Sequence, residues 1–293
     1  MGDIFTVKGL TKQYTDFTLK DVSMNLPGGA IMGIIGENGA GKTTLMKLIL
    51  GLLKPNSGEI EILGSRDAMG SKEIREQVGV VFDESRFHEC FTTKEIGNIM
   101  KNLYSAWDSG YYKKLCALFS LPERKKIKDY SKGMKMKLSI AAALAHHPKL
   151  LMLDEPTSGL DPVARDEILE VFQDFISDEE HSIFFSSHIT SDLEKIADYV
   201  SFLKKGELCF SLQQETLRDT FAMLQCSRTL AVSDRLKNLS AGMKESNFGC
   251  EVLLKCSVPE ARRLLAELGE TSAVVEPVSL ENIMLLYQGG KMK

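Results

Sequence analysis

Two short stretches of this 293-residue sequence hold residue types that can bind phosphates and activate water. The first spans residues 36–44, reads GENGAGKTT and fits the pattern G-x-x-x-x-G-K-[ST]. Glycines let backbone N–H groups turn inward around an anion, and the positive end of a following helix adds to that attraction. Lys42 has the length to reach the β- and γ-phosphates of a nucleotide, while the Thr43 hydroxyl can bind Mg²⁺. A glycine-rich turn without a ligand is the alternative interpretation. We expect nucleotide contacts from Gly36, Glu37, Asn38, Gly39, Ala40, Gly41, Lys42, Thr43 and Thr44.

The second stretch, residues 150–158, reads LLMLDEPTS and places two carboxylates after an apolar run. A strand that ends in Asp154 would aim this carboxylate at the Mg²⁺ bound by Thr43. The adjacent Glu155 would orient or deprotonate the water that attacks the γ-phosphate. An Asp-Glu pair on its own could be a solvated strand end. Downstream of a phosphate loop, the metal and base roles are favoured.

Both stretches need a parallel β-sheet to hold them, and the sequence pattern predicts one. The apolar run at residues 30–35 precedes the phosphate loop and a helical pattern at residues 44–50 follows it, which is the order that such a loop requires. Strands separated by helices indicate an α/β fold with helices on the faces of a parallel sheet. Further strands are predicted at residues 4–7, 17–26, 58–64, 78–82, 149–153, 182–187 and 199–203.

Two other layers accompany the predicted sheet. Short strands among the first thirty residues indicate an antiparallel β layer beside the nucleotide site. From residue 93 to about residue 147 the apolar spacing becomes helical, which predicts an all-helical insertion.

The sequence after about residue 213 predicts a small α+β appendage. Strand-like pieces lie at residues 221–226 and 250–256, and a helix with Pro259 near its start covers residues 260–268. A final helix is predicted to open at Ser279 and to stop at Gly289-Gly290. The appendage has no recognisable catalytic constellation, so dimer contact, regulation and docking all stay open.

Composition limits what this nucleotide site can serve. The net charge of −4 does not favour nucleic acid or an anionic membrane as a partner. The six cysteines include no C-x-x-C pair, which favours reduced packing residues in a cytosolic protein. No basic-then-apolar segment opens the sequence, and no uncharged apolar stretch approaches the roughly 20 residues that span a bilayer. Any work at a membrane would need another subunit as anchor.

Three further motifs extend the pattern: SKGMK at residues 131–135, SGLD at residues 158–161 and SSH at residues 186–188. With the motifs in this order, the chain resembles the nucleotide-binding subunit of ATP-binding-cassette (ABC) transporters over about residues 3–210. The resemblance implies a P-loop NTPase fold with a RecA-like parallel sheet, and it implies ATP and Mg²⁺ as ligands. It divides the chain into an ATPase domain at residues 1–214, with a helical subdomain at about residues 84–148, and an accessory domain at residues 215–293.

The resemblance also assigns roles to single residues. Ser131 and Gly133 would bind the γ-phosphate held by the other subunit of a head-to-tail dimer, and Asp161 would lie in the loop that connects the two sites. His188 would act with Lys42 and Glu155 in catalysis. Tyr14 would stack on adenine. The alternatives are a capped helix start for Ser131, a structural role for His188, and a core or surface position for Tyr14.

One position departs from the family pattern. After the strand at residues 78–82 the family places a glutamine that binds Mg²⁺, whereas this chain has Asp83. Aspartate still offers an oxygen to the metal but adds charge and loses the amide donor. We expect Asp83 to keep the role on the metal. Nearby, Phe87 and Phe91 are either anchors for a helix of the membrane subunit or core residues.

Basic side chains concentrate at residues 124–137, in the segment RKKIKDYSKGMKMK. We interpret this segment as a solvated surface beside a phosphate-binding helix, with lipid headgroups or a partner as the alternative. Interleaved aromatics that would favour single-stranded nucleic acid are few.

The resemblance implies an ATP-hydrolysing subunit that dimerises around two ATP molecules and drives a separate integral-membrane permease from the cytoplasmic face of the membrane. The dimer could be a homodimer or a heterodimer with a paralogous ATPase subunit. The SKGMK motif, Asp83 and the short appendage resemble export-type (ABC-2-like) ATPases of Gram-positive bacteria, some linked to peptide-antibiotic resistance. The alternative is a soluble ABC ATPase that acts on the ribosome or on nucleic acid. Such relatives usually carry two cassettes or long coiled coils, so we expect no nucleic-acid partner here.

Overall fold

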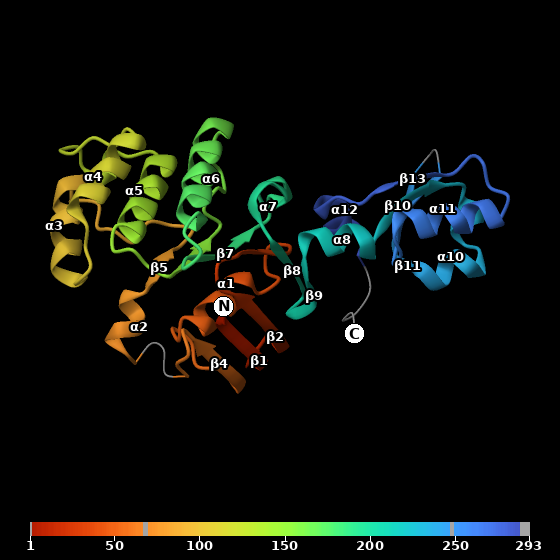
Figure 1. Ribbon diagram of the computed structural model, residues 1–293, viewed down its shortest axis with the longest axis horizontal. Coiled ribbons are helices and arrows are strands. Elements are labelled where there is room, and N and C mark those ends of the chain that lie inside the picture. The colour runs from red at the N-terminus through yellow and green to blue at the C-terminus, as the bar shows by residue number, and fades with distance from the viewer. Residues whose placement is uncertain (1, 67–69, 247–248, 288–293) are drawn as a thin grey trace.

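A six-stranded sheet at the centre of the chain carries most of the residues singled out above (Figure 1). The computed structural model describes residues 2–66, 70–246 and 249–287. The strand order is β5-β6-β7-β3-β8-β9, and all pairs are parallel except β8 with β9. The strands are β3 (Ile31–Ile35), β5 (Val78–Val81), β6 (Leu150–Asp154), β7 (Ser182–Ser187), β8 (Tyr199–Lys204) and β9 (Glu207–Gln213). The predicted parallel sheet is confirmed, and β9 is an antiparallel addition that the sequence pattern did not predict.

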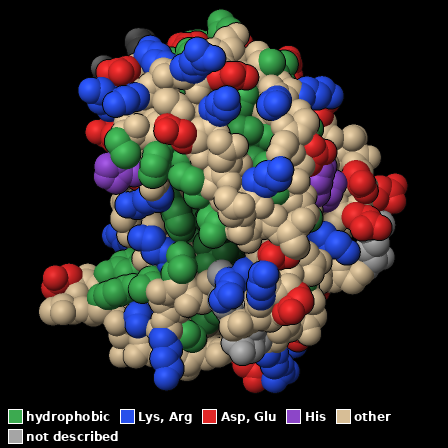
Figure 2. Space-filling model, turned by 90° about the vertical axis from the view of Figure 1, so that its left-hand side faces the viewer, with side chains coloured by type: hydrophobic (Ala, Val, Ile, Leu, Met, Phe, Trp, Pro, Cys, Tyr) green, Lys and Arg blue, Asp and Glu red, His purple; other side chains and the backbone are tan. Residues whose placement is uncertain are grey.

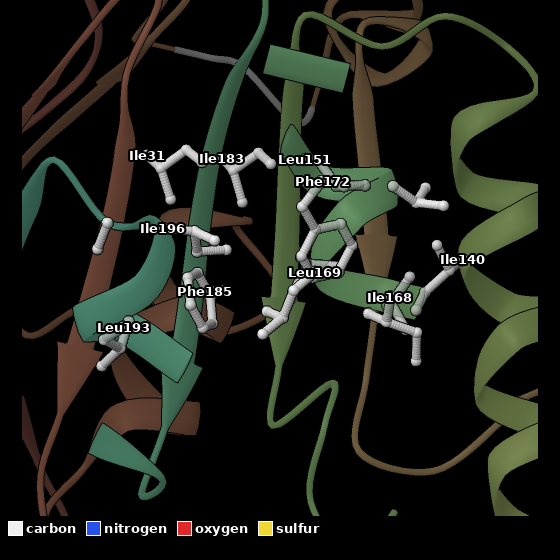
Figure 3. Close-up of a cluster of buried hydrophobic side chains, with 14 of the residues drawn as sticks. Ile31, Ile140, Leu151, Ile168, Leu169, Phe172, Ile183, Phe185, Leu193 and Ile196 are labelled. Carbon is white, nitrogen blue, oxygen red and sulfur yellow. The ribbon is translucent and has the colours of Figure 1, made fainter. Parts of the chain in front are cut away.

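Helices and a second sheet cover the two faces of this central sheet, which is why its strands are continuous apolar runs. Ile31 and Leu151 face one hydrophobic cluster, while Met32 and Met152 face the other. Figure 3 shows the first cluster, where side chains from α5, α6 and α7 pack on the strands. Helix α1 packs on the opposite face. The bounds of these helices are α1 (Lys42–Ile49), α5 (Lys132–Leu144), α6 (Pro162–Ile176) and α7 (Thr190–Ile196).

The second sheet is the predicted antiparallel layer. It has the order β2-β1-β4, with β1 (Asp3–Gln13), β2 (Thr18–Pro27) and β4 (Ser57–Ile62). The expectation that the first strand ends at residue 7 was wrong. Pairing with β2 resumes at Leu10 after a register shift, and Gly9 provides the positive φ of 60° at this irregularity.

The predicted helical insertion is confirmed. Its helices are α3 (Thr93–Leu103), α4 (Ser109–Leu118) and α5, with a short 3₁₀ turn η1 (Ile127–Asp129) before α5, whereas α2 (Lys72–Glu76) lies outside it, before β5. Helix α3 begins with a capping box, in which Thr92 accepts from the N–H of Glu95 and the Glu95 carboxylate accepts from the N–H of Thr92. Figure 1 shows α3, α4 and α5 grouped at the end of the molecule opposite to the C-terminal residues.

The C-terminal residues form a separate four-stranded antiparallel sheet with the order β11-β12-β10-β13 (Figure 1). We call residues 222–287 the C-terminal unit. Together with its helices, the order along the chain is β-α-β-β-α-β, the split βαβ topology. Helix α8 (Gln214–Thr220) precedes the C-terminal unit. The elements of the unit are β10 (Ala222–Cys226), α9 (Arg228–Ala231), α10 (Asp234–Leu239), β11 (Ser240–Ser246), β12 (Gly249–Leu254), α11 (Val258–Glu267), β13 (Val274–Pro277) and α12 (Leu280–Leu286).

The predicted α+β character of this appendage is confirmed, although β11 and β13 were missed. Ser279 caps the final helix, because its hydroxyl accepts from the N–H of Asn282 at 3.1 Å. The predicted stop at Gly289-Gly290 lies outside the described residues. All six cysteines are free. Among the described helices, none is long and apolar enough to cross a membrane.

Candidate functional site

The phosphate loop joins β3 to α1 in a conformation that glycine makes possible. Gly39 and Gly41 have φ values of 82° and 109°, in the region that side chains disfavour. A Cβ atom at Gly36 would lie 2.3 Å from the carbonyl oxygen of Leu203 in β8. The loop therefore depends on three glycines, two for backbone direction and one for close packing.

Lys42 opens α1 and turns its side chain back along the loop. Its side chain is only 6% exposed, and its Nζ donates to the carbonyl oxygen of Gly36 at 2.7 Å. Nζ also lies 3.3 Å from Oε1 of Glu155. A buried ammonium group needs such partners, since desolvation without them is costly. The cation is thus positioned inside the loop before any phosphate arrives.

Asp154 and Thr43 meet across the boundary between β6 and α1. The Thr43 hydroxyl donates to Oδ2 of Asp154 at 2.8 Å, and the Ser186 hydroxyl donates to Oδ1 at 2.6 Å. Asp154 is 1% exposed, so these two hydrogen bonds compensate for its lost hydration. Ser186 faces Asp154 because the two are paired in the β6–β7 register. Ser186 was not predicted as a site residue, although it opens the SSH motif at the end of this strand.

Glu155 follows β6 with a positive φ of 52°, a conformation uncommon for a residue other than glycine. Its N–H donates to the Ser186 hydroxyl at 3.1 Å, which fixes the turn. Its Oε2 lies 2.6 Å from Nδ1 of His188 and accepts from the His188 N–H at 3.3 Å. Because Oε1 contacts Lys42, the carboxylate is held between the phosphate loop and the end of β7.

Lys42, Thr43 and Glu155 line one pocket, whose lining includes the aromatic side chain of Phe17. Tyr14 is 44% exposed and is not among the described residues that line this pocket. Phe17 is, and its ring lies 6.4 Å from that of Tyr14, centroid to centroid. Phe17 was not predicted as a site residue, because it lies in the connection between β1 and β2 and only the folded chain brings it next to Gly41. The lining residues are Asp16, Phe17, Glu37, Asn38, Gly39, Ala40, Gly41, Lys42, Thr43, Thr44, Asp83 and Glu155.

A divalent cation fits the oxygen atoms at this place. Thr43 and Asp154 supply a hydroxyl and a carboxylate that already touch, and the exposed Asp83 lines the same pocket. Within the described residues there is no group of three or more His, Cys, Asp or Glu side chains that could enclose a metal ion. Mg²⁺ is typically held by one or two carboxylates together with substrate phosphates, so a sparse protein ligand set suits it.

Ser131, Gly133 and Asp161 lie apart from this pocket, at the N-termini of α5 and α6. The Ser131 hydroxyl accepts from the N–H of Met134 at 3.2 Å, and Asp161 accepts from the N–H of Ala164 at 3.0 Å. The latter bond holds the pKa of Asp161 below its ordinary value. A Cβ atom at Gly133 would lie 3.4 Å from Leu160, so the two helix starts are neighbours. None of the three lines the pocket of its own chain in the described residues.

The segments beside α5 carry the two aromatic side chains and the basic run singled out in the sequence. Phe87 and Phe91 are partly buried and pack against the large hydrophobic cluster, so they belong at least in part to the core. In the basic segment, Lys135 pairs with Glu89 at 2.8 Å and Lys137 pairs with Glu167. Two of the seven basic side chains in this segment are therefore paired with carboxylates of the chain.

The sequence and the structure are similar to proteins of one family. A family model described as "ABC transporter" matches residues 19–158, and one described as "AAA domain, putative AbiEii toxin, Type IV TA system" matches residues 126–191. The ABC transporter ATP-binding protein YtrB of Bacillus subtilis (strain 168) is 28% identical over 94% of each chain. The Bacitracin transport ATP-binding protein BcrA of Bacillus licheniformis is 35% identical over 71% of this chain and 69% of its own. A solved structure described as "Structure of ATP binding subunit of ABC transporter" has a TM-score of 0.67 and 30% identity, over 73% of this chain and 92% of its own.

Proposed function

This chain belongs to the ABC transporter family of ATP-binding ATPases, and from that premise we propose that it powers a membrane permease that exports a peptide antibiotic. The contact of one carboxylate, Glu155, with both Lys42 and His188 carries the enzymatic part of the proposal. Similarity to the bacitracin transport protein BcrA supports the choice of cargo. The alternative, action on a ribosome or on nucleic acid, has no support in the relatives reported above.

Binding of ATP begins with an exchange of partners at Lys42. In the structure its ammonium group faces the Glu155 carboxylate at 3.3 Å. The β- and γ-phosphates carry more negative charge than one carboxylate, so they replace Glu155 at Nζ. Backbone N–H groups of the glycine turns and of the start of α1 face the same phosphates. Glu155 is then released from the phosphate loop.

The released Glu155 stays next to His188, which orients it through the 2.6 Å contact with Nδ1. From there the carboxylate accepts a proton from the attacking water, and His188 faces the γ-phosphate. Ser186 keeps the turn at residue 155 rigid, because it bonds both Asp154 and the Glu155 backbone. Thr43, Asp154 and Asp83 would hold Mg²⁺, which neutralises charge on the phosphates when it is bound.

The positions of Ser131 and Gly133 support a head-to-tail dimer. Both lie at a capped helix start, neither lines the chain's own pocket among the described residues, and Ser131 is exposed. Free N–H groups at a helix N-terminus attract phosphate. A second subunit that placed its phosphate loop opposite this helix would complete two sites at once, with Asp161 between them.

The surface of the helical insertion supports the permease contact. Figure 2 shows hydrophobic side chains gathered in a hollow on this end of the molecule, with Lys and Arg side chains beside it. Leu103 on α3 and Leu118 on α4 are 61% and 58% exposed. A groove between these two helices is lined by Trp107 and Tyr112 among others. Large exposed apolar side chains near aromatic-lined grooves are typical of protein contacts.

The experiment is reconstitution with the protein encoded next to this chain. A permease with several apolar segments of about 20 residues should co-purify with the chain from membranes. In an antibiotic-sensitive host the pair should raise resistance to bacitracin-like peptides, and Glu155→Gln in the same pair should not. Resistance equal to that of the empty host would exclude the cargo. Co-purification with ribosomes and with no membrane protein would overturn the transporter assignment as well.

A further inference from the structure

The C-terminal unit is attached to the ATPase sheet by a cluster of aromatic rings around Tyr287. This side chain follows α12, is fully buried, and meets the rings of Phe202, Phe210 and Phe221 edge-on. The centroid distances are 5.8, 6.0 and 6.0 Å. Phe202 and Phe210 belong to β8 and β9, so the attachment is made on the same sheet that carries the phosphate loop.

The strand that receives Tyr287 also supports the phosphate loop. Lys204, the last residue of β8, donates from Nζ to the backbone carbonyl oxygen of Tyr287. The carbonyl oxygen of the preceding residue, Leu203, lies so close to Gly36 that a Cβ atom there would be only 2.3 Å away. In the following turn, the N–H of Gly206 donates to the carbonyl oxygen of Ala40 at 3.0 Å. The turn between β8 and β9 thus contacts the loop on one side and the C-terminal unit on the other.

A second contact joins α12 to the helix that follows His188. Glu194 in α7 accepts at Oε1 from the N–H of Leu280, the first residue of α12, at 2.7 Å. Next to it, Leu193 fills the space beside Gly33 in β3, where a Cβ atom would lie only 1.8 Å from the leucine side chain. Helix α12 therefore contacts α7, and Tyr287 after it contacts the end of β8, whose Leu203 lies against the phosphate loop.

We propose that α12 and Tyr287 are positioning elements for ATP binding, which hold the β8–β9 turn against the phosphate loop. The inference rests on the proposed use of that loop for ATP and adds a role for the C-terminal unit. A loop that is held in its binding geometry binds phosphate without a reorganisation cost, so release of the turn weakens binding. A partner that displaced the C-terminal unit would change ATP affinity through the same contacts.

The first test removes the hydrogen bond from Lys204 to Tyr287 in the full-length chain. Lys204→Met should raise the Kd for Mg-ATP about tenfold, because small displacements of binding groups are costly. Lys204→Arg, which can still donate, should restore affinity. Lys205→Met is the matched control, because it removes the same charge from an exposed neighbour that makes no hydrogen bond or ion pair among the described residues. Equal affinities for Lys204→Met and Lys205→Met would overturn the proposal.

The second test separates positioning from folding. Tyr287→Leu loosens the aromatic cluster. Val252→Ala removes volume from β12 in the four-stranded sheet of the C-terminal unit, where Val252 belongs to a different hydrophobic cluster from Tyr287. We expect weaker ATP binding only for Tyr287→Leu, when the two are compared at temperatures equally far below their Tm. Equal loss in both variants would show a purely structural role. A wild-type chain that binds no ATP would overturn the proposed function itself, whereas unchanged variants of an ATP-binding wild type would overturn only the positioning role.

Discussion

At the scale of single residues, Glu155 takes part in both ATP binding and hydrolysis in the proposed mechanism. Its two oxygens contact Lys42 and His188 at 3.3 and 2.6 Å. Glu155→Gln keeps the shape and an acceptor for His188 but removes the charge and the base. We expect turnover to fall by at least about a hundredfold, the usual contribution of a general base. ATP should still bind, and a dimer with trapped ATP should accumulate.

Phosphate release and light scattering measure the two effects of Glu155→Gln. Glu170→Gln is a suitable control, because Glu170 is exposed on α6 and should leave both readings unchanged. Normal hydrolysis in Glu155→Gln, or a failure to dimerise with ATP, would contradict the role assigned to this carboxylate.

Asp83 is exposed at the edge of the same pocket, in the position where the family carries glutamine. With its carboxylate on Mg²⁺, Asp83→Ala should raise the Mg²⁺ concentration needed for half-maximal hydrolysis by several-fold. Asp83→Asn keeps an oxygen ligand, so its Mg²⁺ requirement should lie between those of the wild type and Asp83→Ala. A magnesium titration of ATPase activity measures this. Glu84→Ala provides the neighbouring control, and identical titration curves for all variants would exclude Asp83 from the metal site.

The site residues that could be predicted from the sequence are those that lie together in one short motif. The phosphate loop and Asp154-Glu155 each lie in one short motif, and the structure brings both motifs together at the end of the sheet. Ser186 and Phe17 were missed, because Ser186 is placed by the register of β7 against β6 and Phe17 by the connection that joins β1 to β2. Contacts fixed by strand pairing between distant segments leave little local signal.

At the scale of elements, burial on both faces explains which strands were predictable. Strands β3 and β6 are short apolar runs and β7 has an apolar centre, and their shortness is typical of strands buried on both faces. By contrast, β11 reads SAGMKES and β13 has four residues that end in Pro277. Both are edge strands, where polar residues and proline are common, so their sequences do not resemble strands.

His146 follows the C-terminal end of α5, and its protonation should change the stability of the fold. His146 is 2% exposed, stacks on Tyr104 with a centroid distance of 4.0 Å, and has no hydrogen-bond partner of normal geometry at either ring nitrogen among the described residues. Burial lowers the pKa of His146 from 6.5 to about 4, and the nearby backbone of Ala142 and Val78 offsets this only in part.

Because the folded chain keeps His146 neutral, the unfolded chain binds its proton first as the pH falls. The stabilisation is complete above pH 6.5 and is lost progressively as the pH falls toward about 4. The free energy of unfolding should drop by up to about 3 kcal/mol from this group across that window. Denaturant unfolding of wild type and His146→Leu measures it. An equal slope in wild type and His146→Leu would contradict the assignment.

At the scale of the whole molecule, the chain joins an ABC-type ATPase to a C-terminal unit. This unit and helices α3, α4 and α5 lie at opposite ends of the molecule (Figure 1). The pocket is lined by Lys42, Thr43 and Glu155, whereas Ser131 and Gly133 do not line it among the described residues. In the proposed head-to-tail dimer, a second chain would bring its own Ser131 and Gly133 to this pocket. Site sharing is therefore the property of the assembly that most needs a direct test.

Two inactive variants provide that test when they are mixed. Lys42→Ala removes the phosphate contact of one half-site and Ser131→Arg blocks the other, so each variant alone should be nearly inactive. In a mixed head-to-tail homodimer, one site pairs the intact loop of the Ser131→Arg chain with the intact helix start of the Lys42→Ala chain. Since about half of the dimers are mixed and each regains one of two sites, an equal mixture should recover up to about a quarter of wild-type turnover. A mixture that dimerises with ATP yet shows no more activity than the separate variants would contradict a shared site.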